Sequence, residues 1–211
     1  MKSHLTLLLA AALCITTPGL AEDAPTEAAA VPAKVAATHD ALRDLWIGHI
    51  FWVRRVVEAR LADNSKQAKA AEQQVVANAQ AIAGAIEPFY GAAASDRLFE
   101  LLAGHWGAIS DYLDATIAET DRDQSGAADR LSANARDIAA FLSSANPNWP
   151  EETLLALLTA HGAHHVQQIA QLNAGQYEEE ATTWTAMKDH MYVIADALTA
   201  GLAKQFPDMF Q

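Results

Sequence analysis

Apolar residues recur along this chain at steps of three and four, the period of a helix with one buried face. The first such segment contains Leu42, Leu45, Trp46, Trp52, Val53, Val56 and Val57. After a polar break at residues 63–65, a second stripe carries Val75, Ile82 and Ile86 and stops near Pro88. The two segments predict a helical hairpin.

The same pattern is repeated at a spacing of 56 residues. Leu42, Leu45 and His49 are matched by Leu98, Leu101 and His105, and then by Leu154, Leu157 and His161. Asn78, Ile82 and Ala83 are matched by Asn134, Ile138 and Ala139, and then by His190, Ile194 and Ala195. We therefore predict three repeated hairpins, residues 38–93, 94–149 and 150–211. Together they form an all-α, six-helix, up-and-down bundle.

Turn signals predict where the later hairpins begin, turn and end. In the second hairpin we expect a helix from Ser95 to Thr120, a turn at Asp121–Gly126 and a helix to about Ser144. In the third we expect a helix from Pro150, a turn near Gly175 and a helix that ends at Pro207. Pro150 suits a first helical position, and the acids after it suit the positive start of a helix.

The histidines fall at fixed distances from these turns. His49 and Asn78 are 29 residues apart, as are His105 and Asn134, and His161 and His190. Residues symmetric about the turn of an antiparallel hairpin lie at the same height. The six side chains are therefore expected in one polar layer across the bundle.

One interpretation of this layer is purely structural. His49 is seven residues after Leu42 and seven before Val56, so it should point inward. A buried imidazole needs partners for both nitrogen atoms, and Asn78 and Asn134 are suitable partners. Hydrogen bonds from His to Asn within the hairpins would then fix the register of the helices.

The other interpretation is a shared metal ion. Three helices related by a pseudo-threefold axis would bring three equivalent histidines together, a recurrent arrangement for zinc or copper. The third hairpin adds candidate ligands, because His165 replaces Val53 and Ile109 of the other hairpins, and Met187 precedes His190 by three residues. The candidate ligands are His49, His105, His161, His165, His190 and Met187, with Asn78 and Asn134 as their hydrogen-bonding partners.

The N-terminus is typical of an exported protein. Residues 1–21 contain Lys2, an apolar run too short for the roughly 20 residues of a membrane span, and small residues before a cleavage point. We predict that this segment is a signal peptide and that the mature protein is periplasmic or secreted, with no membrane span. Cys14 is the only cysteine, so its removal leaves no thiol. Residues 22–37 are rich in Ala, Pro and Glu, which predicts a flexible leader.

Charge and motif content exclude several classes of function. Loss of Lys2 with the signal peptide takes the formal charge from −12 to −13, which disfavours nucleic acid and anionic membranes as partners. The chain has no P-loop, nucleophile elbow or dinucleotide fingerprint, and no Glu-x-x-His motif of a di-iron bundle. Haem held by His161 and His190 is a less favoured cofactor than a metal ion, and covalent haem attachment would need cysteine.

Three longer motifs carry a resemblance. They are Leu45-Trp46-x-x-His49-x-x-Trp52, Phe141 to Trp149, and His190-Met191 through Asp196 to Phe210. Together they resemble a family of small bacterial helical proteins, over nearly all of the mature chain. Members carry labels such as glycosyltransferase or acetylglutamate kinase, and neither label fits a chain without a strand pattern or a nucleotide-binding loop. The resemblance implies a helical domain and no particular reaction.

These patterns favour a helical bundle that binds copper or zinc through a central histidine layer, with a role in metal binding, storage or delivery. The alternative is a metal-free helical module in which the layer specifies packing and the outer face binds a protein. Catalysis ranks third, since an open metal position could activate water.

Overall fold

The computed structural model describes residues 32–211, so the predicted signal peptide and Cys14 lie outside the described residues. The helices are α1 (Ala33–Leu61), α2 (Ser65–Gly84), α3 (Glu87–Tyr90), α4 (Ala92–Ile117), α5 (Asp121–Ala145), α6 (Glu151–Asn173), α7 (Tyr177–Gln205) and the short 3-10 helix η1 (Pro207–Phe210). No strand occurs in this part of the chain. The predicted all-α bundle of six long helices is confirmed.

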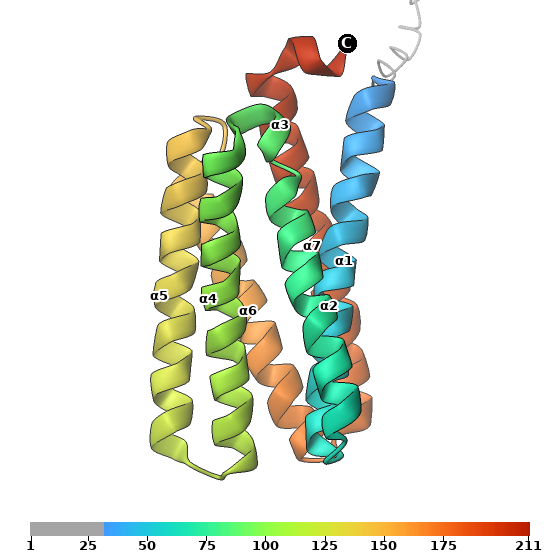
Figure 1. Ribbon diagram of the computed structural model, residues 1–211, viewed down its shortest axis with the longest axis vertical. Coiled ribbons are helices and arrows are strands. Elements are labelled where there is room, and N and C mark those ends of the chain that lie inside the picture. The colour runs from blue at the N-terminus through green and yellow to red at the C-terminus, as the bar shows by residue number, and fades with distance from the viewer. Residues whose placement is uncertain (1–31) are drawn as a thin grey trace, which may run out of the picture. The chain divides into compact units, whose positions relative to one another are not determined.

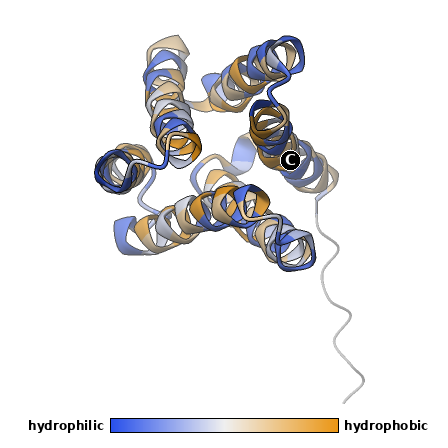
Figure 2. Cartoon of the chain, turned by 90° about the horizontal axis from the view of Figure 1, so that it is seen from below, coloured by the Kyte–Doolittle hydropathy of each residue, from blue (hydrophilic) through white to orange (hydrophobic). Residues whose placement is uncertain are grey.

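The six long helices form a closed ring (Figures 1 and 2). Each helix packs on the next one along the chain, and α7 returns to pack on α1. Helix α6 also contacts α4 and α1 across the interior. The first helices of the three hairpins therefore approach one another at the centre, which the sequence alone left open.

The turn of the second hairpin differs from its prediction. The chain turns at residues 118–120, where Glu119 adopts a positive φ of 55°, and α5 already begins at Asp121. Asp121 and Asp123 lie in the first helical turn, where carboxylates interact favourably with the helix dipole. Residues 121–126 are polar because they form an exposed helix start, and the prediction that they form the turn is wrong.

Helix α1 also begins earlier than expected. It starts at Ala33, directly after Pro32, within the segment predicted to be a flexible leader. Alanine is the best helix former, so residues 33–37 can extend the helix without an apolar stripe of their own. Pro150 precedes α6 as its cap residue, one position before the predicted one. The turn at Gly175, with a φ of 69°, and the end of α7 before Pro207 agree with prediction.

Two apolar clusters fill the interior of the ring. We call the first the Leu42 cluster; it includes Leu42, Leu98, Leu154, Ile82, Ile138 and Ile194. The second, the Val56 cluster, includes Val56, Val57, Ile109, Leu113 and Ile169. Along α1 the Leu42 cluster ends at Ile50 and the Val56 cluster begins at Val53. The inward-facing histidines lie at the boundary between the two clusters.

Candidate metal centre

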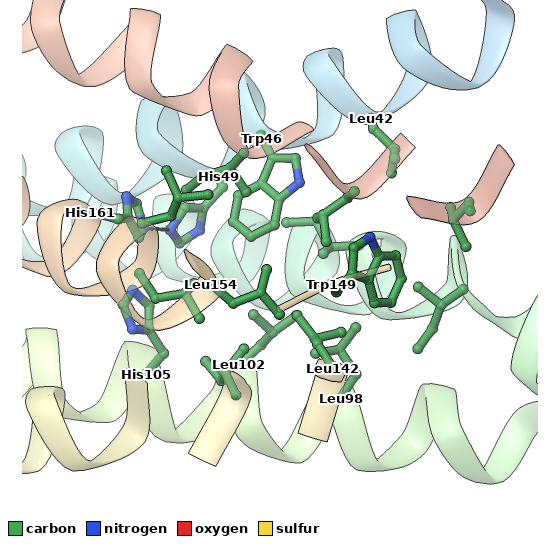
Figure 3. Close-up of a pocket in the computed structure, with 18 residues that line it drawn as sticks. Leu42, Trp46, His49, Leu98, Leu102, His105, Leu142, Trp149, Leu154 and His161 are labelled. Atoms are coloured by element: carbon green, nitrogen blue, oxygen red, sulfur yellow. Dashed lines mark hydrogen bonds between the residues drawn. The ribbon is translucent and has the colours of Figure 1, made fainter. Parts of the chain in front are cut away.

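Four histidines meet at this boundary. His49 comes from α1, His105 from α4, and His161 and His165 from α6, and one ring nitrogen from each lies within 4.8 Å of the others. All four are buried, with His161 and His165 only 1 % exposed. Figure 3 shows His49, His105 and His161 projecting inward from different helices. Among residues 32–211, the group that could hold a metal ion consists of histidines alone.

The Nε2 atom of His161 is the centre of this cluster. It lies 3.2 Å from Nε2 of His49 and 3.2 Å from Nε2 of His165. The ring of His105 stacks on that of His161, with centroids 5.3 Å apart and an interplanar angle of 19°. A ring nitrogen carries either one proton or one lone pair, so Nε2 of His161 can complete only one of the two hydrogen bonds well.

Other nitrogen atoms of the cluster have no partner at all. The Nδ1 atoms of His161 and His165 and the Nε2 atom of His105 are buried and make no hydrogen bond. Buried polar groups without a partner are uncommon and destabilise the folded state. The cluster therefore holds more polar atoms than it can satisfy internally.

Burial keeps these imidazoles neutral. It lowers the pKa of His49 to about 3, and repulsion from His105 acts in the same direction. It lowers the pKa of His105 to about 4, although the Asn134 side chain opposes the shift. The pKa values of His161 and His165 fall well below the usual range, chiefly through burial and then through the neighbouring histidines. At neutral pH each ring has a lone pair available, as a metal ligand requires.

The spacing of the nitrogen atoms fits a metal ion. Zinc–imidazole bonds of about 2.0–2.1 Å place two ligand nitrogens of a tetrahedral site about 3.3 Å apart. The two pairs made by His161 are already at 3.2 Å, and no pair of the four ligand atoms exceeds 4.8 Å. Shifts of roughly 1–2 Å would complete a four-imidazole site, a ligand set that suits zinc and copper. The space beside these histidines, about 40 Å³, is too small for a porphyrin, which argues against haem.

Neither Asn78 nor Asn134 makes a hydrogen bond of good geometry to a cluster histidine, although the Asn134 side chain is near enough to His105 to raise its pKa. Asn78 donates instead to the Leu45 backbone carbonyl at 3.0 Å, and Asn134 donates to that of Leu101 at 2.9 Å. His190 holds the corresponding position in the third hairpin and donates to the carbonyl of Leu157 at 2.8 Å. All three bonds span 33 residues, and each accepting carbonyl lies four residues before a cluster histidine.

One predicted ligand, His190, is placed elsewhere. His190 is outside the four-histidine group, and its ring lies 5.4 Å, centroid to centroid, from that of His164. Met187 is fully buried and packs in the Leu42 cluster. His49, His105, His161 and His165 are the predicted ligands that the fold brings together.

Glycines explain how asparagine reaches the backbone in two of the hairpins. A Cβ atom on Gly48 would lie 3.0 Å from Nδ2 of Asn78, and one on Gly104 would lie 3.1 Å from Nδ2 of Asn134. The third hairpin has Ala160 at this position, and there the longer His190 side chain makes the bond. The exchange of Asn for His follows from local packing and adds no ligand.

A second buried polar group was missed from the sequence. Glu180 is 2 % exposed, accepts two hydrogen bonds of 2.7 Å from Arg54, and accepts a third of 2.8 Å from Gln168. Glu180 follows two other acids at the start of α7, so in the sequence it resembles an exposed residue that interacts with the helix dipole. The available signal was the inward stripe that it forms with Thr183 and Met187, both buried.

Fold and site together define an all-α bundle with a buried four-histidine cluster. Comparison with protein-family models, curated proteins and solved structures finds no match to this chain. The resemblance to small bacterial helical proteins therefore stays a prediction. None of the helices in residues 32–211 is both long and apolar enough to cross a membrane.

Proposed function

We propose that this protein binds one transition-metal ion, copper or zinc, through His49, His105, His161 and His165. Its role would be metal binding, storage or delivery in the periplasm or outside the cell. The observation that carries the proposal is the convergence of Nε2 atoms on His161, with two neighbours at 3.2 Å. The pattern of residues 1–21 supports export.

For the alternative role, fixing helix register, the layer residues outside the four-histidine cluster suffice. Asn78, Asn134 and His190 each tie one hairpin together through a backbone carbonyl. A packing device would also satisfy its own buried nitrogens, whereas this cluster leaves several without a partner. A cation bound through one nitrogen of each ring would give Nε2 of His105 a partner and remove the competition at Nε2 of His161. The Nδ1 atoms of His161 and His165 would still lack a partner.

The buried, uncharged ligand set also influences which charge of metal ion is bound best. Four imidazoles leave the full ionic charge in the protein interior, where the cost of burying a charge is high. That cost rises with the square of the charge, so it is about four times larger for a divalent than for a monovalent ion of similar size. Between the two oxidation states of copper, the site should favour Cu(I).

The test is a metal titration of the purified protein without an added histidine tag. After treatment with a chelator, the protein is titrated with Cu(I), Cu(II) and Zn(II) against competing ligands, and its melting temperature is recorded. One ion per chain is expected. At a free concentration about 100 times Kd, a bound ion stabilises the fold by about 2.7 kcal/mol.

Neighbouring histidines provide the matched control. His165→Ala should weaken binding at least tenfold, because it removes a cluster ligand. His164→Ala should leave affinity unchanged, because His164 lies beside it in sequence but outside the cluster. Equal losses in both variants would indicate binding at the surface. A folded, stripped protein that takes up no ion would leave a metal-free helical module that binds a protein partner.

A further inference from the structure

A cavity of about 40 Å³ lies in the Leu42 cluster, directly against the histidines (Figure 3). Most of its lining residues form triads at the 56-residue spacing. These triads are Leu42, Leu98 and Leu154; Trp46, Leu102 and Leu158; His49, His105 and His161; Ile82, Ile138 and Ile194; and Ile86, Leu142 and Leu198. The remaining lining residues are Trp149, Leu157 and Leu202. We call this space the chamber.

The walls of the chamber are almost entirely apolar. Apart from the three histidines and the tryptophans Trp46 and Trp149, every lining residue is Leu or Ile. A buried water needs two to four polar partners, so such a space favours an apolar occupant. Its volume is well below the roughly 150 Å³ of an engineered apolar cavity that holds benzene or xenon, and above the roughly 10–15 Å³ of cavity that one water needs. The size suits a diatomic molecule or one noble-gas atom.

The chamber meets only one side of the histidine cluster. His49, His105 and His161 line it, whereas His165 does not. His165 is one helical turn further along α6, at the position matched by Val53 and Ile109, both of which belong to the Val56 cluster. The four histidines therefore have an apolar space on one side and a fourth imidazole on the other.

We propose that the chamber binds one small uncharged molecule of diatomic size and holds it against the side of the histidine cluster that His165 leaves open. Binding within the chamber depends only on its apolar walls. Contact between that molecule and a metal ion rests in addition on the proposed function. The protein would then bring a dissolved gas to a buried metal centre with an apolar space beside it.

Xenon is the probe for the chamber itself. The chemical shift of dissolved ¹²⁹Xe is recorded against concentration of the metal-free protein, and a saturable shift equivalent to one site per chain is expected. Ile194→Phe should remove this shift, because the added ring fills the chamber. Ile169→Phe is the matched control: the same exchange is made in the Val56 cluster, away from the chamber, so the shift should remain.

Folding is checked by circular dichroism, and Leu98→Ala provides an independent reading. That substitution enlarges the chamber, so xenon affinity should rise several-fold even if Ile194→Phe does not fold. Absence of a saturable shift in the folded wild type would overturn the proposal. Equal xenon binding by wild type, Ile194→Phe and Leu98→Ala would overturn it as well.

Carbon monoxide tests contact with the metal. Cu(I) holds at most four ligands, so carbon monoxide must replace one of the four imidazoles to bind. In protein loaded with Cu(I), an infrared band of bound carbon monoxide is expected in the wild type and should be lost in Ile194→Phe. Xenon binding without any metal uptake would refute the proposed function and leave the chamber site intact. Xenon and Cu(I) binding without a carbon monoxide band would overturn the contact between the two.

Discussion

His165 lies 3.2 Å, Nε2 to Nε2, from His161 on the same face of α6. It holds the position at which the other two hairpins carry Val53 and Ile109, both almost fully buried. Since Nε2 of His161 can also pair with His49, the second pairing with His165 is redundant for the fold. His165 is thus a buried polar residue at a position where the protein elsewhere uses aliphatic ones.

We expect His165→Val to stabilise the metal-free protein by about 1–2 kcal/mol, because it removes a buried nitrogen without a hydrogen-bond partner. The same variant should bind metal at least tenfold more weakly. Urea unfolding of stripped samples and competition titration measure the two effects. A gain in stability with a loss of affinity is the trade-off of a functional residue. Loss of stability in the metal-free state would instead support a structural role for His165.

Stability should fall steeply in mild acid. The unfolded histidines have a pKa of about 6.5, whereas His105 and His49 have folded pKa values of about 4 and about 3. Between these limits the unfolded state binds more protons than the folded state. Each histidine therefore lowers the free energy of unfolding by about 1.4 kcal/mol for each unit of decrease in pH. Four such groups together would lower the free energy of unfolding by about 5.5 kcal/mol per pH unit, comparable with the whole stability of a small domain.

The free energy of unfolding should therefore be level above about pH 6.5 and be lost between about pH 6 and 4. Urea midpoints measured across this range test the expectation. A bound metal ion should move the acid transition to lower pH, because protons then compete with the ion for the imidazoles. A level profile down to pH 4 would show that the histidines are accessible to protons in the folded state.

Gly104→Ala should destabilise the protein when Asn134 is present and stabilise it when Asn134 is replaced by alanine. In a helix alanine is favoured over glycine by about 0.5–1 kcal/mol. A Cβ on Gly104 would lie 3.1 Å from Nδ2 of Asn134 and displace that amide from the Leu101 carbonyl, so we expect a net loss of about 1 kcal/mol. In the background of Asn134→Ala, the same substitution should stabilise by about 0.5–1 kcal/mol. A double-mutant cycle by thermal unfolding measures the difference, and additive effects would contradict it.

Replacing Arg54 should destabilise the protein more than replacing its partner Glu180. Arg54→Met leaves a carboxylate that is only 2 % exposed without its two hydrogen bonds, which we expect to cost about 3–5 kcal/mol. Glu180→Gln should cost less, about 1–2 kcal/mol, because the Arg54 side chain is 31 % exposed and can reach water. Chemical denaturation at neutral pH compares the two. Equal losses would mean that Glu180 gains solvent once its partner is removed.

The fold was predictable because the apolar period is regular. Leu42, Leu98 and Leu154 occupy equivalent places around one chamber, as their 56-residue spacing predicts. The turn at residues 118–120 was not predictable in the same way, since Asp and Ser are common both in turns and at helix starts. The common origin of the three hairpins stays a prediction.

The candidate site was predictable in position but not in its bonding. Seven-residue spacing from Leu42 was enough to turn His49 inward, and the four-residue step from His161 brought His165 into the same group. Spacing could not show that Asn78 would donate its hydrogen bond to a backbone carbonyl and not to an imidazole. That choice depends on the close approach that Gly48 permits, which is a property of packing between helices.

Because the helices form a closed ring, the chain could begin at another turn without changing which helices pack together. Pro32 and Gln211 line a common surface pocket, so the two ends of the described chain are close together, and α7 packs on α1 as any hairpin neighbour would. A circular permutant that begins at Gln176 and joins residue 211 to residue 32 by a short flexible linker should keep the same helical content. Its four histidines should also keep their spacing, as metal titration would report, because the new ends lie in the exposed turn at Gly175.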